Sequence, residues 1–102
     1  MSASDVWFVY LARCADDSLY TGIARNVALR IEEHGAGKGA RYTRGRGPIE
    51  LYARQRCTSK RDALVLEAAV KRLSRAQKQR LYDSRFFGAF ARSVKAARAA
   101  KA

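Results

Sequence analysis

Five side chains of this sequence are of the chemical types that hydrolysis of a phosphodiester would need: Tyr10, Tyr20, Arg30, His34 and Glu67. The reaction needs a group that deprotonates water, positive charge against the phosphoryl oxygens, and help for the leaving oxygen. A guanidinium fork holds phosphate oxygens and keeps its charge at any working pH, which suits Arg30. A carboxylate such as Glu67 is a hard oxygen ligand for Mg²⁺ or Mn²⁺, and a single divalent ion is expected.

Both tyrosines are predicted to lie on a β-hairpin. Residues 6–14 are rich in aromatic and β-branched types, residues 15–18 have the composition of a turn, and residues 19–24 continue as a second strand. Side chains alternate across a strand, so Tyr10 and Tyr20 share a face only if the hairpin loop holds an odd number of residues or contains a bulge. A shared site therefore makes a specific demand on the turn.

Arg30 and His34 are predicted to lie on one helix. Asn26 is a good N-cap for it, and Gly35, directly after His34, is a natural C-terminal stop. Positions 27, 30, 31 and 34 form one stripe of such a helix. The two polar side chains therefore lie on the face that should pack.

A third strand and further helices are predicted to follow. After Pro48, the alternation of apolar and polar residues from Ile49 to Arg54 indicates a strand with one buried face. Ser59 caps a helix, and Glu67 falls inside its apolar stripe of Ala63, Leu66, Val70 and Leu73. A glutamate there costs stability unless it is paired or binds a ligand. Residues 76–82 are expected to form another short helix.

The triplets Phe8-Val9-Tyr10 and Tyr20-Thr21-Gly22, followed by an arginine on one helix and a glutamate on a later one, resemble the GIY-YIG nuclease family. The resemblance runs from about Val6 to about Leu73 and is closest to the small, single-domain members. Phe8 departs from it, since the family's first triplet begins with glycine. The resemblance implies an α/β fold of the α+β type, in which helices flank a small three-stranded antiparallel sheet.

The resemblance also implies a metal-dependent DNA endonuclease and roles for its site residues. Tyr10 takes the place of the general base, which requires the metal and Arg30 to lower its pKa from about 10. Tyr20 and His34 would orient the water or the phosphate, with His34 able to shuttle a proton, and the sequence leaves open which of the three is the base. Gly22 allows a backbone to approach phosphate or a neighbouring side chain, although strand curvature also explains it.

The charge of the chain indicates nucleic acid as its partner, and DNA is expected. With 21 Lys and Arg against 9 Asp and Glu, the formal net charge is +12. Residues 35–47 form a glycine-rich basic loop, which suits contact with phosphates without reading bases. Its candidate contacts are Lys38, Arg41, Tyr42, Arg44 and Arg46, with Tyr42 able to stack on an unpaired base. Solubilising charge is the competing explanation of this loop.

The length of 102 residues fits one domain. This nuclease-like domain is predicted over residues 1–82, followed by a basic Ala/Lys/Arg-rich C-terminal tail over residues 83–102 that is helical or partly disordered. No apolar run approaches the roughly 20 residues of a membrane span, and the acidic start differs from a secretory signal, so a cytoplasmic protein is expected. Cys14 and Cys57 lack the spacing of a zinc site and are expected to be reduced thiols.

Two other functions compete with the leading hypothesis, which is a structure-selective DNA endonuclease linked to repair or recombination by the resemblance alone. A nucleic-acid-binding module that does not cleave would keep the fold and the charge. An interaction subunit would dock on a partner protein through Phe86, Phe87 and Phe90, and their exposure in the isolated chain would support this function. The sequence leaves the oligomeric state open.

Overall fold

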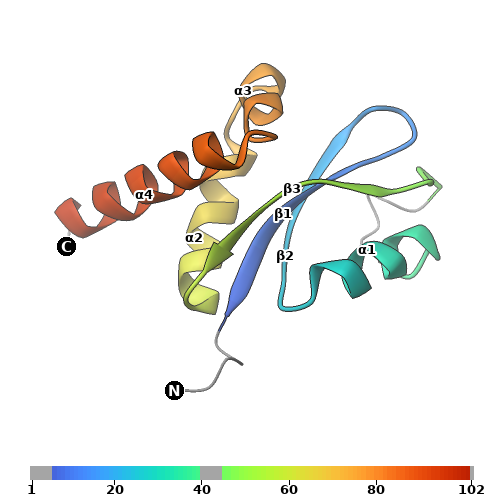
Figure 1. Cartoon of the computed structure of the whole chain (residues 1–102), viewed down its shortest axis with the longest axis horizontal. Coiled ribbons are helices and arrows are strands. Elements are labelled where there is room, and N and C mark those ends of the chain that lie inside the picture. The colour runs from blue at the N-terminus through green and yellow to red at the C-terminus, as the bar shows by residue number, and fades with distance from the viewer. Residues whose placement is uncertain (1–5, 40–44, 102) are drawn as a thin grey trace.

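The computed structural model describes residues 6–39 and 45–101. Its strands are β1 (Trp7–Arg13), β2 (Leu19–Ala24) and β3 (Glu50–Cys57), and its helices are α1 (Val27–Gly35), α2 (Lys60–Lys71), α3 (Arg75–Arg80) and α4 (Ser84–Lys101). The strands form one antiparallel sheet in the order β2-β1-β3. Helix α1 lies on one side of this sheet, and α2 and α4 lie on the other (Figure 1). The predicted three-stranded sheet flanked by helices is confirmed.

Strand β1 is buried on both of its faces because it is the central strand and helices cover both sides. Val9 and Leu11 join the core that α2 and α4 cover, where Phe87 is also buried. Tyr10 and Ala12 point the opposite way, into a smaller apolar cluster under α1. Alternation along one strand thus divides its side chains between a packing core and the face that carries the tyrosines.

The loop between β1 and β2 has an odd number of residues, as a shared face for Tyr10 and Tyr20 requires. Ala12 pairs with Tyr20, and Tyr10 pairs with Gly22. The Cys14 N–H donates to the Ser18 carbonyl at 2.9 Å, which leaves residues 15–17 as the loop. Asp17 has a φ of 68°, the left-handed conformation that ends many three-residue hairpin loops. Directly paired residues project to the same side of a sheet, so the predicted common face of Tyr10 and Tyr20 is confirmed.

Helix α1 begins as predicted but ends differently. The Asn26 side chain caps its first turn by accepting from a backbone N–H. The helix runs through Gly35, and Gly37, with a φ of 79°, is the left-handed residue that stops it. The Lys38 N–H then donates back to the Glu33 carbonyl at 2.9 Å, the long-range bond of a Schellman motif. The prediction that Gly35 is the stop was therefore wrong by two residues, and the chain turns back over the helix end.

Strand β3 departs from the predicted alternation because of a bulge. Leu11 pairs with Ala53 while the next residue, Ala12, pairs with Leu51, so Tyr52 is an extra residue in the ladder. Leu51 is 43% exposed, whereas Tyr52 packs against the core. The prediction of a regular buried face from Ile49 to Arg54 was wrong at this point, since one inserted residue moves its neighbours to the opposite face.

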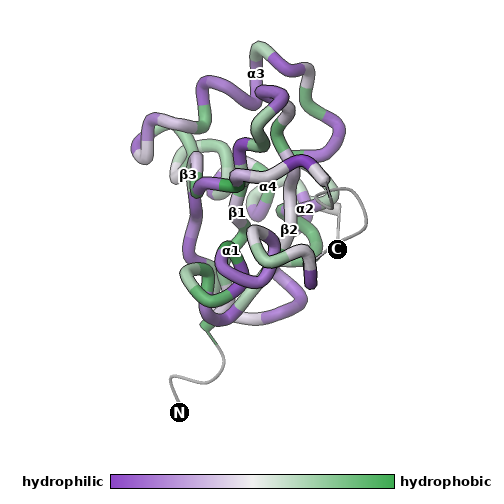
Figure 2. Tube along the Cα trace, turned by 90° about the vertical axis from the view of Figure 1, so that its right-hand side faces the viewer, coloured by the Kyte–Doolittle hydropathy of each residue, from purple (hydrophilic) through white to green (hydrophobic). Residues whose placement is uncertain are grey.

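Helices α2 and α3 follow the sequence expectations. The Ser59 hydroxyl accepts from the Asp62 N–H at 3.0 Å at the start of α2, and the buried positions of this helix are Ala63, Leu66 and Val70. The short helix expected over residues 76–82 is α3, which a capping box between Ser74 and Gln77 begins. Helix α3 buries none of its residues, and Figure 2 colours it mostly as hydrophilic.

Helix α4 packs on α2 and β3, so its phenylalanines belong to the core. Phe87 is 0% exposed, and Phe86 and Phe90 pack against the same cluster, as does Val94 further along. Their packing on the core weakens the hypothesis that these three phenylalanines dock a partner protein. Cys14 and Cys57 are free and buried. None of the helices in the described ranges has the length and apolarity needed to cross a membrane.

Candidate active site

A buried hydrogen bond joins the first tyrosine to the only histidine of the chain. The Tyr10 hydroxyl lies 2.7 Å from His34 Nε2, and each residue is 1% exposed. The Tyr20 ring meets the imidazole edge-on, with 5.2 Å between ring centroids. The strand β1, its neighbour β2 and the end of α1 thus bring three rings together. The prediction that His34 lies on the packing face of its helix is confirmed.

Gly22 makes room for the Tyr10 ring. A Cβ atom at position 22 would lie 2.7 Å from the Tyr10 hydroxyl oxygen and 2.8 Å from Cζ, distances that Cβ atoms essentially never show. The pairing of these two residues across β1 and β2 explains the contact, because the ring extends over the backbone of its partner. The neighbouring side chain that Gly22 accommodates is therefore Tyr10 itself.

Gly39 likewise makes room for the His34 ring. This role of Gly39 was not identified from the sequence. A Cβ atom at position 39 would lie 2.0 Å from Nδ1 of the imidazole and 2.6 Å from Cγ. The Schellman motif at the end of α1 returns the chain over the helix, which places the backbone of residue 39 against the ring. Only the glycine content of residues 35–39 hinted at this contact, and that content has many causes.

Arg30 lies on α1 near Tyr10 and is about one third exposed. Its Nη1 donates to Glu33 Oε1 at 3.1 Å, and its guanidinium is close enough to Tyr10 to act on the pKa of that phenol. Glu33, on the next turn of the helix, was not identified from the sequence. Because a guanidinium has five N–H donors, Arg30 retains donors for a phosphate while the contact with Glu33 holds its side chain.

Glu67 approaches the site from α2, on the other side of the sheet. Its side chain is 17% exposed, and Oε2 lies 3.3 Å from Nζ of Lys71 one turn away. The expectation that a glutamate in the apolar stripe is paired or binds a ligand is thus met by an ion pair with Lys71, which is itself about half-exposed. The Glu67 charge is close enough to Tyr10 to raise its pKa, but this is the smallest of the contributions to that pKa.

Comparison with known proteins identifies the family. The model of the GIY-YIG catalytic domain matches residues 6–81. The chain is a member of the GIY-YIG family. A UPF0213 protein of Cupriavidus necator is 49% identical over 79 residues, which cover 78% of this chain and 86% of that protein. A UPF0213 protein of Natronomonas pharaonis is 53% identical over 74 residues, 72% of this chain and 87% of the relative.

A solved structure is also similar. The solution NMR structure of a UPF0213 protein from Bacillus halodurans has 47% sequence identity and a TM-score of 0.48, and it covers 74% of this chain and 81% of its own. The match to the family model and the identity to the two relatives above show that the chain belongs to the GIY-YIG family, a nuclease family, and within it to the UPF0213 group. The expected family membership is confirmed.

The environment of this GIY-YIG site keeps both partners of the hydrogen bond neutral. Burial raises the pKa of Tyr10 to about 12, with a further upward contribution from Tyr20 that the Arg30 charge opposes. Burial, followed by the Arg30 charge, lowers the pKa of His34. Arg30 lowers the Tyr10 pKa as expected, but burial has the larger effect and the net shift is upward. At neutral pH the phenol keeps its proton and can donate it to an unprotonated imidazole nitrogen.

The basic loop is only partly described. Lys38 is exposed at the end of α1. Arg46 forms an ion pair with Asp16 of the hairpin loop, and its carbonyl accepts from the Ala15 N–H at 2.7 Å. The other predicted contacts, Arg41, Tyr42 and Arg44, lie outside the described residues. Arg46 thus helps to fix the start of the third strand against the hairpin, a structural contact the sequence did not predict.

Proposed function

We propose that this protein is a metal-dependent endonuclease that hydrolyses phosphodiester bonds in DNA. The observation that carries the proposal is the 2.7 Å contact between the Tyr10 hydroxyl and His34 Nε2, with Arg30 beside it. A phenol that has a proton acceptor on one side and a cation on the other is equipped for proton transfer next to a phosphate. Membership of a nuclease family supports this assignment.

In the proposed mechanism Tyr10 is the general base and His34 receives its proton. Tyr10 takes a proton from the attacking water as its own hydroxyl proton moves to Nε2 of His34. The O–H bond of water breaks, a new phenolic O–H bond forms, and the charge ends on the imidazole. This route avoids a free phenolate, which a pKa of about 12 would make rare at pH 7. The resulting hydroxide attacks phosphorus, the bond to the leaving oxygen breaks, and that oxygen takes a proton from water while His34 returns its proton to solvent.

Arg30 and Tyr20 would bind and orient the substrate. The guanidinium can hold two phosphoryl oxygens at once and stabilise the charge that grows on them in the transition state. Its bond to Glu33 at 3.1 Å sets the direction of the fork before substrate arrives. Tyr20 packs edge-on against His34 and is half-buried, so its hydroxyl is suited to orienting the water or a phosphoryl oxygen.

Glu67 is the residue that would hold a divalent ion. Among the described residues there is no group of three His, Cys, Asp or Glu side chains that could bind a metal. A single carboxylate still fits Mg²⁺ or Mn²⁺, because such ions keep several waters and take only one or two protein carboxylates beside substrate phosphate. The ion would supply positive charge at the phosphate and the leaving oxygen. Lys71 is exposed enough to release Glu67 for that purpose.

Recognition by the shape of DNA is the mode of selection we propose. The 21 Lys and Arg side chains of this protein suit contact with phosphates. Such contacts position a protein on DNA without reading its bases. Selection by structure would suit a role in repair or recombination. A cytoplasmic location remains our expectation for such an enzyme.

A second candidate function is a nucleic-acid-binding module that does not cleave. The observation that favours it is the burial of Tyr10, which is 1% exposed and whose pKa is raised rather than lowered. A phenol in that state serves equally well as a packing residue. The two functions differ in a single observable, which is metal-dependent cleavage.

The discriminating experiment is cleavage of labelled single-stranded, duplex, flapped and branched DNA with and without Mg²⁺. Glu67→Gln removes the proposed metal ligand, and Glu32→Gln, on the exposed side of α1, makes the same chemical change away from the site. The wild type and Glu32→Gln are expected to cleave, and Glu67→Gln is expected to bind without cleaving. Binding without cleavage by the wild type on every substrate would establish the second candidate instead.

A further inference from the structure

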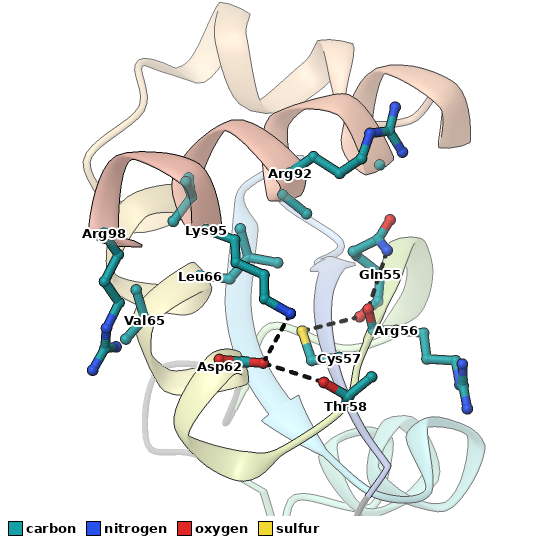
Figure 3. A pocket seen from close by; sticks show the side chains of 13 residues that line it. Gln55, Arg56, Cys57, Thr58, Asp62, Val65, Leu66, Arg92, Lys95 and Arg98 are labelled. Atoms are coloured by element: carbon teal, nitrogen blue, oxygen red, sulfur yellow. Dashed lines mark hydrogen bonds and ion pairs between the residues drawn. The ribbon is translucent and has the colours of Figure 1, made fainter. Parts of the chain in front are cut away.

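A hollow of about 180 Å³ lies on the side of the sheet opposite the tyrosine site (Figure 3). The end of β3, the first half of α2 and the length of α4 form its walls. The wall that α4 supplies lies beyond residues 6–81, which match the family. This hollow is therefore a feature that the match to the GIY-YIG catalytic domain does not account for.

The floor of the hollow is uncharged. Cys57 and Leu66 are buried there, with Ala91 and Val94 of α4 beside them. Burial, and after it the charge of Asp62, raises the pKa of the Cys57 thiol, so the sulfur stays protonated at neutral pH. An apolar, uncharged floor of this kind suits a nucleobase or the C–H face of a sugar, and offers nothing that would bind a bare ion.

The mouth of the hollow is cationic. Arg56, Arg92 and Arg98 extend from three sides of it (Figure 3). No ion pair joins any of these three to another described residue. Residues 84–101 contain five basic side chains and no Asp or Glu. A guanidinium without a carboxylate partner is available for the phosphate of a ligand.

The acidic residue at the hollow, Asp62, is paired with a lysine. Asp62 Oδ2 lies 3.8 Å from Nζ of Lys95 and 3.2 Å from the Thr58 hydroxyl oxygen. Lys95 thereby closes one side of the hollow, and Figure 3 shows it pointing toward Asp62 across the gap between α4 and α2. The Asp62 charge is thus compensated locally and does not repel an anion at the mouth.

We propose that this hollow binds a second segment of the nucleic-acid substrate, with phosphates on Arg92 and Arg98 and a sugar or unpaired base on the apolar floor. The proposal rests on the function proposed above and deepens it, because a strand held on one side of the sheet while another is cut on the opposite side would select branched or flapped DNA. An acidic peptide meets the same charges, but at a net charge of +12 it must compete with nucleic acid for the whole protein.

The first test locates the bound strand by NMR on the ¹⁵N-labelled chain. A short single-stranded oligonucleotide is added without metal, and the expected result is displaced amide signals at Gly88 and Arg92 as well as at Tyr20 and Gly22. Displacement at the tyrosine site alone would overturn the second site and leave the proposed function standing. Displacement at the hollow alone would keep the second site and contradict the proposed function. Displacement at the hollow by polyglutamate but not by the oligonucleotide would overturn the proposal in favour of an acidic protein.

The second test removes the charges. A double variant that carries Arg92→Gln and Arg98→Gln is compared with a control double variant that carries Arg72→Gln and Arg85→Gln. The control removes the same charge from exposed residues that do not line the hollow. The affinity for single-stranded DNA is measured over a range of salt. Loss of two phosphate contacts lowers the slope of log K against log salt by about 1.4, and this change is expected for the first pair only. Equal changes in both pairs would overturn the proposal, since total charge would then explain the binding.

Discussion

Gly22 and Tyr10 face each other across the first two strands, and the tyrosine ring lies over the space that a side chain at position 22 would fill. A Cβ atom there would lie 2.7 Å from the phenolic oxygen. The glycine of one triplet therefore fixes the hydroxyl of the other at the point where it meets His34. The two triplets that mark this family in sequence are one packing unit in space.

Substitution of Gly22 by alanine should displace the Tyr10 ring. Overpacking of this kind costs about 2 kcal/mol of the free energy of unfolding, and a displacement of about 1 Å in a catalytic group can cost about 100-fold in rate. Urea unfolding and single-turnover cleavage measure the two effects. Gly35→Ala is the matched control, because nothing lies within 4 Å of a Cβ at that position. Equal behaviour of the two variants would show that the Gly22 contact is unimportant.

The elements of this fold were predictable because each has a local signal. The hairpin, the caps at Asn26 and Ser59 and the stripe of α2 depend on residues within a few positions of one another. The condition of an odd hairpin loop was also accessible, since it follows from the alternation of a strand. These signals left the length of the hairpin loop open, and it was the family resemblance that brought Tyr10, Tyr20 and His34 into one expected site.

Long-range contacts were not predictable in the same way. The bulge at Tyr52 depends on pairing with β1, and the burial of Phe87 depends on where α4 lies against β3. Gly39 is one of several glycines that follow His34 closely in the sequence. Only the fold shows that it is the one that contacts the His34 ring. The direction of the Tyr10 pKa shift likewise depends on burial, which exceeds the effect of Arg30.

Substitution of Gly39 by alanine should move His34 without touching either tyrosine directly. The chain has one histidine, so its imidazole signals can be followed by NMR without ambiguity. A displaced ring is less buried, and we expect its pKa to rise toward the ordinary value of about 6.5. Cleavage should fall in parallel. An unchanged titration curve in Gly39→Ala would show that the backbone of residue 39 does not position the ring.

The lowered pKa of His34 predicts that acid weakens the fold. The unfolded chain, with a histidine pKa of about 6.5, takes up the proton before the folded protein does. The contribution of His34 to the free energy of unfolding is therefore complete above that pH and is lost as the pH falls through the folded pKa. The measurement is urea unfolding of the wild type and His34→Gln between pH 8 and 5. The difference between them should shrink toward acid, and a constant difference would contradict the assignment.

Thr21, in the second triplet, should be replaceable with a gain in stability. Its hydroxyl oxygen is buried and has no hydrogen-bond partner among the described residues. Valine has nearly the same shape without the unsatisfied polar atom, so Thr21→Val is expected to add about 1 kcal/mol to the free energy of unfolding. Thr58→Val is the control, since that hydroxyl has Asp62 as a partner. A loss of stability in Thr21→Val would mean that the buried hydroxyl is satisfied after all.

In the proposed mechanism, Tyr10 and His34 act as one proton-transfer unit in DNA cleavage. The most direct test is a double-mutant cycle on the single-turnover cleavage rate with Mg²⁺, using Tyr10→Phe, His34→Gln and the variant that carries both. Groups that act as a unit are strongly non-additive, so each single variant should lose nearly as much rate as the double variant, while DNA binding is retained. Independent, additive losses would contradict the proton relay, and a wild type that does not cleave would contradict the proposed activity itself.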